Sequence, residues 1–583
     1  MAASALSVAS QEKRERFLKW LIVAILVLCL FNFIRFIQEE IAPYFPVMTD
    51  QGYYLKNAHQ YWDYSKTHGY WNLLKAHFSH DKPALGFYPS SNLQMSLLAS
   101  LLFPLVGATR AGALSIHIFS WLVLLTLFAW VLRKITNSWF WPALGVALLL
   151  STSFSFVSAG GIADFRMEFP AACWTSISLL AWCWFLQYPK KHAAWMAAGL
   201  TFGLFSFRLI SIPYWILPIT FLLIYASFCP CAPRIFPRNK LRSAQIPILC
   251  LGMASLVLLI WNQTFIKEYY LGAFLAEVPL KSMHSSTWKE VLYYPKSLWE
   301  SHFGRFAFVE LGAIFIFRLL ASAYFSFSLQ KKKPSESVTL YPETLFFCFS
   351  LVLSAICVLS LSPHRTPQHA GIVAPSLAIG LVFLILRHAP KRSKLSQTVG
   401  AALLLVGGFL CWQWQLLQSA PFKDQARREE ATLNHVFDSI TTRINRLDRI
   451  RHDALDMPNI VFLDWVEGFS HNSIFLYGRE HLGYGKSLEM TVPRYIFTLS
   501  QKELLAEIHN ASVVVMPENS QALAERPWPI MQSIRENFAI LTSEVQSTMK
   551  FAETFQYHGV RYRLYFSPLL SEASSKTPPQ KEN

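Results

Sequence analysis

Ten polar residues in four short segments could carry out chemistry together. They are Asp50, Asp81 and Lys82; Asp164, Arg166 and Glu168; Arg208; and His364, Arg365 and His369. A carboxylate can take the proton from a hydroxyl group that attacks another molecule. Arginine and lysine can bind and neutralise a phosphate leaving group, arginine through two parallel hydrogen bonds and lysine as a point charge. These residue types therefore favour the transfer of a group from a phosphate to an acceptor hydroxyl.

Each of the four segments also has a simpler interpretation. Asp50 precedes residues 51–70, which are rich in aromatic and amide side chains and resemble a helix lying in the membrane interface. The second segment can form a local ion-paired turn. Arg208 can extend its charged end to the lipid headgroups, and His364 and His369 can be loop or headgroup residues rather than metal ligands. The sequence assigns no residue to a metal site.

Composition identifies a polytopic membrane protein. The chain has 583 residues, of which 53% are hydrophobic and only 15% charged, which is too apolar for one soluble core. The net charge of +16 does not indicate a nucleic-acid partner, because Lys and Arg fall largely between hydrophobic segments. There they set topology and meet anionic membrane lipids. The nine cysteines are scattered and form neither a disulfide framework nor a zinc pattern.

Eleven apolar segments are expected to cross the membrane. They are residues 17–37, 111–132, 139–158, 171–188, 193–207, 212–226, 246–261, 306–329, 345–361, 372–386 and 398–414. We expect residues 88–106 to lie in the interface, because a twelfth span would place most basic clusters on the wrong face. The first span is interpreted as a retained signal anchor with a cytoplasmic N-terminus. With this topology all four polar segments meet at the outer, non-cytoplasmic face.

The fold class predicted is therefore an α-helical polytopic membrane protein with interfacial helices and a C-terminal soluble α/β domain. The transmembrane domain would cover residues 1–418, with a first outer loop at 38–110. Residues 419–571 would form the extracytoplasmic domain, since NIVFLDWV, ASVVVMP and GVRYRLYF are typical of strands and SQKELLAEIHN of a helix. Residues 572–583 are polar and are expected to be disordered.

The order of these features resembles the membrane-embedded C-type glycosyltransferases (GT-C fold) that use polyprenyl-phosphate sugars. The lipid A aminoarabinose transferase and protein O-mannosyltransferase branch is the most similar. That family has an acidic residue in the first outer loop, an acidic-Lys-Pro triplet, an acidic-x-Pro turn, and a lysine between two short spans. Here these are Asp50, Asp81-Lys82-Pro83, Glu168-Phe169-Pro170 and Arg208. The sequence departs from the pattern in having Gln51 rather than a second acidic residue, glutamate at 168, and arginine at 208.

The resemblance implies a hexosyl- or pentosyltransferase in which Asp50 is the general base and Asp81 and Glu168 are further catalytic carboxylates on the acceptor or metal side. The residues expected to bind substrate are Lys82, Asp164, Arg166, Arg208, His364, Arg365 and His369. One base and no covalent step predict inversion at the anomeric carbon. The implied partners are a polyprenyl-phosphate-linked sugar donor and a lipid, glycan or protein acceptor. No cofactor is required, a divalent metal ion is optional, and the expected location is the bacterial inner (cell) membrane.

Two other function classes fit part of the sequence. A transporter or flippase of lipid-linked glycans would be polytopic, but it predicts charges spread through the depth of the helices and often a duplicated architecture. Here the charges gather at one face and no internal repeat is visible. A structural or sensory protein would carry its function in the C-terminal domain, in which no nucleophile or phosphate-loop motif is found.

Overall fold

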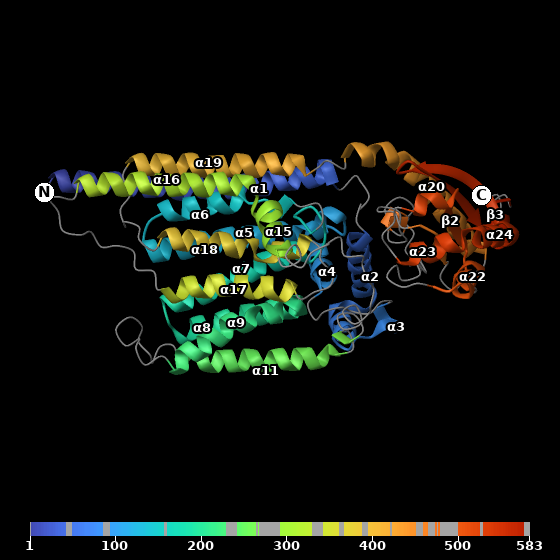
Figure 1. Ribbon diagram of the computed structural model, residues 1–583, viewed down its shortest axis with the longest axis horizontal. Coiled ribbons are helices and arrows are strands. Elements are labelled where there is room, and N and C mark those ends of the chain that lie inside the picture. The colour runs from blue at the N-terminus through green and yellow to red at the C-terminus, as the bar shows by residue number, and fades with distance from the viewer. Residues whose placement is uncertain are drawn as a thin grey trace. The chain divides into compact units, whose positions relative to one another are not determined.

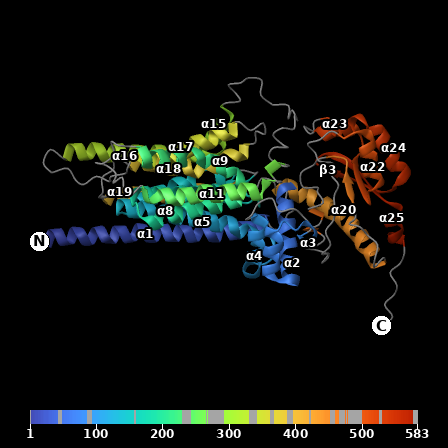
Figure 2. The same cartoon turned by 90° about the horizontal axis from the view of Figure 1, so that it is seen from below.

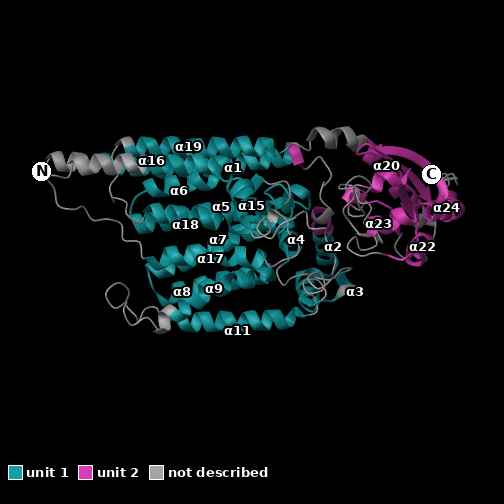
Figure 3. Cartoon of the chain, viewed as in Figure 1, with its two compact units in different colours: residues 1–39, 57–275, 284–420 teal, residues 40–56, 276–283, 421–583 magenta. Residues whose placement is uncertain are grey.

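The structure is a computed structural model, and the chain divides into two compact units (Figure 3). The first unit comprises residues 1–39, 57–275 and 284–420, and the second comprises 40–56, 276–283 and 421–583. The structure describes residues 2–41, 49–85, 94–156, 160–228, 242–263, 266–267, 292–328, 342–360, 367–386, 395–419, 423–450, 459–464, 473–474, 476–477, 499–524 and 529–575.

The first unit is built almost entirely from helices, whose arrangement Figures 1 and 2 show. Residues 49–56, at the start of the second of these helices, belong to the second unit. The α-helices are α1 (Ala2–Phe36), α2 (Thr49–Phe78), α3 (Lys82–Leu85), α4 (Met95–Val106), α5 (Arg110–Thr136), α6 (Phe140–Ser151), α7 (Glu168–Gln187), α8 (Lys191–Phe207), α9 (Ile212–Phe228), α11 (Gln245–Trp261), α15 (Tyr293–Ser297), α16 (Gly304–Ser328), α17 (Pro342–Ser360), α18 (Ala374–Leu386) and α19 (Leu395–Gln418). Short 3-10 and π segments join several of them, including η2 (Phe154–Phe156), η3 (Leu209–Ser211), η6 (Leu298–Phe303) and η8 (Pro367–Val373).

Within the described residues, six helices are long and apolar enough to cross a membrane. They are Ser10–Ile41, Arg110–Thr136, Glu168–Gln187, Pro342–Ser360, His369–Leu386 and Gln397–Gln418, and four shorter apolar helices accompany them. Each of the eleven predicted spans overlaps a described helix, but the count of eleven stays a prediction. The 12-residue α4 is only about 18 Å long, too short for a hydrocarbon core of about 30 Å. Its length agrees with an interfacial position, but α6, in the predicted span 139–158, also has 12 residues, so the interfacial position of α4 stays a prediction.

Helix α7 lies at the centre of the bundle. It packs against α5, α8, α17, α18 and η8, and 89% of its most apolar 18-residue window is buried inside the protein. Its own Trp182 is fully buried, and so is Trp121 of α5, whose ring contacts Phe169 of α7. Because α7 is enclosed on most sides, the position of its first residue, Glu168, is set by several neighbouring elements.

The helices of the first outer loop share a small core of their own. Gly69 interrupts α2 with φ 80° and ψ 158°, a conformation that only glycine adopts readily. The chain therefore turns there, and Tyr61 before the turn donates to Gln94 Oε1 at 3.0 Å, with its hydroxyl also 2.7 Å from Nδ1 of His77. Tyr61 and Leu97 belong to one buried cluster, so α2 and α4 fold as a single piece of structure.

The second unit contains a four-stranded sheet in the order β1-β2-β4-β3. The strands are β1 (Ile460–Phe462), β2 (Val513–Pro517), β3 (Lys550–Tyr557) and β4 (Val560–Phe566). Strands β1 and β2 are parallel, whereas β4 is antiparallel to both β2 and β3. The register pairs Val513 with Phe566 across β2 and β4, and Lys550 with Phe566 across β3 and β4.

Helices cover both faces of the sheet. They are α20 (Lys423–Ile450), α22 (Gln501–His509), α23 (Pro529–Glu536), α24 (Phe538–Thr548) and α25 (Pro568–Ser575). Residues of α20 and α25 share one buried cluster with the sheet, and residues of α22, α23 and α24 share the other. Every residue of β2 is consequently buried. Helix α25 ends at Ser575, inside the segment 572–583 that the composition predicts to be disordered, and the residues after it lie outside the described part of the chain.

Candidate active site

Three segments that are distant in sequence meet at one end of the helix bundle. Glu168 is the first residue of α7, Arg208 lies between α8 and η3, and His369 lies in η8. Nη2 of Arg208 is 3.7 Å from Oε1 of Glu168 and 3.5 Å from Nδ1 of His369. The structure therefore brings together members of three of the four predicted polar segments.

The turn between α8 and α9 fixes the position of Arg208. Its backbone is extended (φ −143°, ψ 98°), and its N–H donates to the carbonyl of Leu204 at 2.8 Å, which ends α8. The carbonyl of Arg208 in turn accepts from Ser211 at 2.9 Å. Pro213 stands in the first turn of α9, where its missing N–H costs no helical hydrogen bond. This short connection keeps the guanidinium at the end of the bundle.

The loop before α7 carries a second pair of charges. Nε of Arg166 is 2.9 Å from Oδ2 of Asp164, and the same oxygen accepts from the N–H of Gly160 at 2.7 Å. Gly160 has φ +79°, which favours glycine at that turn. Asp164 and Arg166 therefore form the local ion-paired turn that the sequence allows, whereas Glu168 belongs to a different pair.

Burial of these charges bears on the simpler interpretation of Arg208. The exposed fractions of Asp164, Arg166 and Arg208 are 5%, 7% and 5%. An arginine that extends to the headgroups would expose its charged end, so that interpretation of Arg208 is wrong. Charges are rarely buried unless they are paired, and in membrane proteins such residues often mark functional sites.

Both carboxylates retain an oxygen that can accept a proton or a hydrogen bond. Among the described residues, Oδ1 of Asp164 and Oε2 of Glu168 are buried without a hydrogen-bond partner. Burial raises the pKa of the Asp164 carboxyl to about 6, although the charge of Arg166 and the Gly160 N–H oppose that rise. A buried acceptor is normally satisfied, so a hydroxyl donor from a substrate would suit these two oxygens.

His117 is a site residue that the sequence analysis missed. It is fully buried in α5, and its Nδ1–H donates a hydrogen bond to the carbonyl oxygen of Ile162 at 2.9 Å. Its ring packs against Phe169, with ring centroids 5.4 Å apart. His117 thus ties the loop carrying Asp164 to the bundle. An ionisable residue in the middle of an apolar span was the signal that could have identified it.

The structure does not place the remaining predicted residues in this cluster. Oδ1 of Asp81 accepts from the N–H of Ala84 at 3.1 Å and so caps α3, a usual role for aspartate. Asp50 lies in the first turn of α2 and Lys82 in α3, but their side chains fall outside the part that the structure describes. The segment that includes His364 and Arg365 also lies outside it.

The described residues contain no group of three His, Cys, Asp or Glu side chains that could hold a metal ion. Within them the site is built from two carboxylates, two guanidiniums and the imidazoles of His117 and His369. The optional divalent ion stays a prediction.

The apolar helices are those of an integral membrane protein, and the chain has the GT-C type of fold. Two structures of ArnT from Cupriavidus metallidurans, a lipid A aminoarabinose transferase, are similar to the chain. The apo structure has a TM-score of 0.55 at 12% identity and covers 96% of this chain and 99% of its own. The structure bound to undecaprenyl phosphate has a TM-score of 0.52 at 11% identity, with coverages of 94% and 98%.

At such low identity the likeness concerns the fold. The likeness confirms that the chain has the fold of the family that its sequence resembles. No family model and no curated protein matches the chain.

Proposed function

We propose that the protein is a glycosyltransferase that moves a sugar from a polyprenyl-phosphate donor to an acceptor at the outer face of the membrane. The observation that carries this proposal is the buried contact of Arg208 with Glu168 and His369 at one end of the bundle. A buried guanidinium at the end of apolar helices suits a phosphate that arrives on a lipid. The fold likeness to ArnT, with its structure bound to undecaprenyl phosphate, supports this choice of donor.

The cations act on the leaving group. As the bond between the anomeric carbon and the phosphate oxygen breaks, negative charge develops on the phosphate, and a fixed arginine stabilises it with directed N–H groups. Glu168 keeps the guanidinium of Arg208 in place by the attraction of opposite charges at 3.7 Å. Lys82 and Arg365 are proposed as further phosphate contacts, on the basis of their positions in the sequence.

The carboxylates act on the acceptor. Asp50 is proposed to take the proton of the acceptor hydroxyl as its oxygen attacks the anomeric carbon, with Asp81 and Glu168 on the acceptor side. Attack from the face opposite the phosphate, in one step, inverts the configuration at that carbon. The loop of Asp164 and Arg166 would line the substrate cavity, held there by His117.

The finer assignments follow the same proposal. The transferred group is a hexose or a pentose, and the acceptor is a hydroxyl or phosphate on a lipid, a glycan or a protein. No cofactor is required. The protein would reside in the bacterial inner membrane with its N-terminus in the cytoplasm.

Replacement of the proposed base tests the proposal. Purified full-length protein would be given undecaprenyl-phosphate-linked sugars, and release of undecaprenyl phosphate would be measured. Loss of a general base typically costs about 10²–10⁴-fold in rate, so Asp50→Asn should reduce turnover by at least a factor of about 100 without changing the melting temperature. Asp63→Asn is the matched control, because Asp63 lies on the same helix and pairs with Lys66 at 2.9 Å near the surface.

Two results would count against the proposal. Turnover of Asp50→Asn at the rate of the unmodified protein would remove Asp50 as the base. If the unmodified protein consumed no polyprenyl-phosphate sugar, the proposed glycosyltransferase activity would be excluded. If the protein does consume such a donor, mass spectrometry of lipids and glycans from cells that lack the protein would identify the acceptor.

A further inference from the structure

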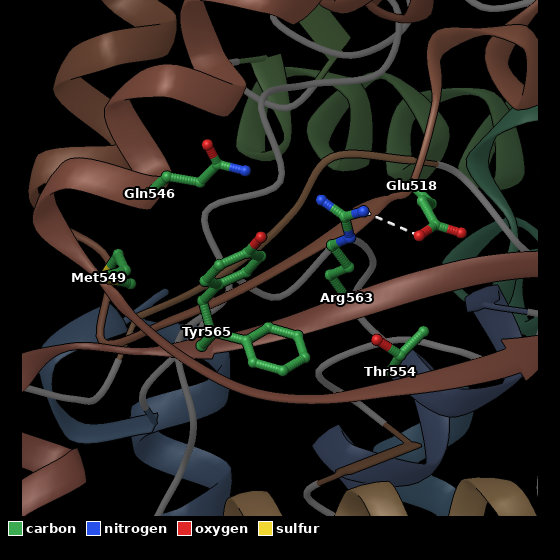
Figure 4. A pocket seen from close by; sticks show the side chains of 7 residues that line it. Glu518, Gln546, Met549, Thr554, Arg563 and Tyr565 are labelled. Atoms are coloured by element: carbon green, nitrogen blue, oxygen red, sulfur yellow. Dashed lines mark hydrogen bonds and ion pairs between the residues drawn. The ribbon is translucent and has the colours of Figure 1, made fainter.

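The second unit has an open cleft on one side of its sheet, with a volume of about 400 Å³. Its lining residues come from the end of β2, from α24, and from the neighbouring strands β3 and β4 (Figure 4). They are Glu518, Gln546, Met549, Phe551, Thr554, Arg563 and Tyr565. Clefts of this size fit a small organic ligand.

Two arginines and one glutamate lie at one end of the cleft, where Arg563 and Glu518 line it and Arg561 pairs with Glu518 from outside the lining. Nη2 of Arg563 lies 2.8 Å from Oε1 of Glu518, and Nη1 of Arg561 lies 3.3 Å from Oε2 of the same residue. Two guanidiniums therefore share one carboxylate, and each guanidinium has five N–H donors. This end of the cleft attracts an anion, and the shared carboxylate holds both arginine side chains in position.

The lining also includes an exposed aromatic ring. Phe551 is 57% exposed, although a phenyl side chain is normally favoured in a core. Its ring centroid lies 5.7 Å from that of Tyr565 in an edge-to-face arrangement, which fixes the ring's orientation. An exposed, oriented ring provides a flat apolar surface that a ligand can cover.

Neutral polar groups complete the lining. The amide of Gln546 reaches in from α24 and the hydroxyl of Thr554 from β3, on two sides of Arg563 (Figure 4). An amide both donates and accepts, and so does a hydroxyl. The hydroxyl groups of a sugar have the same dual character, and one face of a pyranose ring consists of C–H groups that can lie on an aromatic ring.

We propose that this cleft binds an anionic saccharide. The sugar ring lies over Phe551, its hydroxyls bond to Gln546 and Thr554, and its phosphate or carboxylate meets Arg563. The contacts that support this site all lie within the second unit. The proposal therefore does not depend on the proposed transfer reaction, and a binding measurement tests it separately from turnover.

The test uses full-length protein in detergent with four probes: glucose 6-phosphate, glucuronate, glucose and inorganic phosphate. Isothermal titration should show binding of the two anionic sugars at least tenfold tighter than that of glucose or phosphate. Phe551→Ala should weaken binding of both anionic sugars about tenfold, and Arg563→Gln should remove the preference over glucose. Arg535→Gln, the same change at an exposed residue of α23, should change neither.

Several outcomes would overturn the proposal. The first is that neither anionic sugar binds to the unmodified protein. The second is equal binding of phosphate and glucose 6-phosphate, which would indicate a simple anion site. The third is binding that neither cleft substitution alters. If Arg563→Gln lowers the melting temperature, Phe551→Ala decides, because that ring is exposed and its removal leaves the fold intact.

Discussion

Two arginine–glutamate pairs in this protein differ in how deeply they are buried. In the first unit Arg208 exposes 5% of its side chain, and in the second Arg563 exposes 32%. The buried pair is nevertheless the longer, at 3.7 Å against 2.8 Å. Attraction between charges is stronger in a buried setting, so a pair kept only for stability would be expected to close. The greater separation of Arg208 and Glu168 accompanies a third partner, because Nη2 of Arg208 also lies 3.5 Å from Nδ1 of His369.

The comparison also separates two roles of charge. At the surface, water screens an ion pair and little free energy depends on it. Inside the bundle, removing one partner leaves the other charge buried and alone, which is strongly destabilising. Four substitutions, from the largest expected effect to the smallest, test whether the buried charges differ from the exposed ones in this way.

Arg208→Met should have the largest effect, because it leaves Glu168 buried without its cation. We expect a loss of roughly 3–5 kcal/mol in stability and no measurable sugar transfer. The double variant Arg208→Met with Glu168→Gln should regain most of the melting temperature but none of the turnover. Thermal melting in detergent and donor consumption measure the two quantities. If Arg208→Met alone were as stable as the unmodified protein, the buried pair would not differ from the Arg563–Glu518 pair in its effect on stability.

The pH dependence of stability should depend on Asp164. Its pKa is raised by burial from 3.8 to about 6, so the folded protein binds this proton more tightly than the unfolded chain does. Its contribution to stability is complete below about pH 4 and is lost as the pH rises through 6. At about 1.4 kcal/mol per pKa unit, the loss is roughly 3 kcal/mol.

Asp164→Asn removes this titration. The melting temperature of the variant relative to the unmodified protein should therefore be higher at pH 7 than at pH 4.5. An equal difference at both pH values would show that Asp164 does not titrate in this range.

His117→Phe tests a neutral hydrogen bond in the same buried setting. It keeps a ring in the space but leaves the buried carbonyl of Ile162 without its donor, at a cost of about 1–3 kcal/mol. Because His117 positions the loop of Asp164, we also expect a higher KM for the donor. The exposed His192 provides the control, and His192→Phe should leave both measurements unchanged. A lower melting temperature with an unchanged KM would limit His117 to a structural role.

Glu518→Gln should have the smallest effect. Arg563 donates to the Glu518 carboxylate and lowers its pKa, so the pair stabilises the fold above the ordinary carboxyl pKa, and that contribution disappears as the pH falls. The two side chains are 32% and 30% exposed, so water reaches the pair, and screening makes the contribution small. The melting temperature should stay within experimental error at low and at high salt. A large decrease would remove the contrast with Arg208.

Much of the architecture follows from the sequence. The apolar segments locate the helices, and alternation or apolar runs locate β1, β2 and β4, because hydrophobic periodicity is a local property. Strand β3 was missed, since KFAETFQY is mixed in polarity and becomes a strand by pairing with β4. The break at Gly69 was missed as well, because no local pattern marks a positive φ there.

For the site, the sequence identified Asp164, Arg166, Glu168, Arg208 and His369 as residue types suited to phosphate and proton chemistry. It did not determine which of them pair. Arg208 meets His369 across 161 positions of the chain, and His117 meets Ile162 across 45. Such contacts depend on how whole helices pack, which only the tertiary structure fixes. Residue type and hydrophobic pattern are set locally, whereas the partner of a buried charge is set by the fold that excludes water around it.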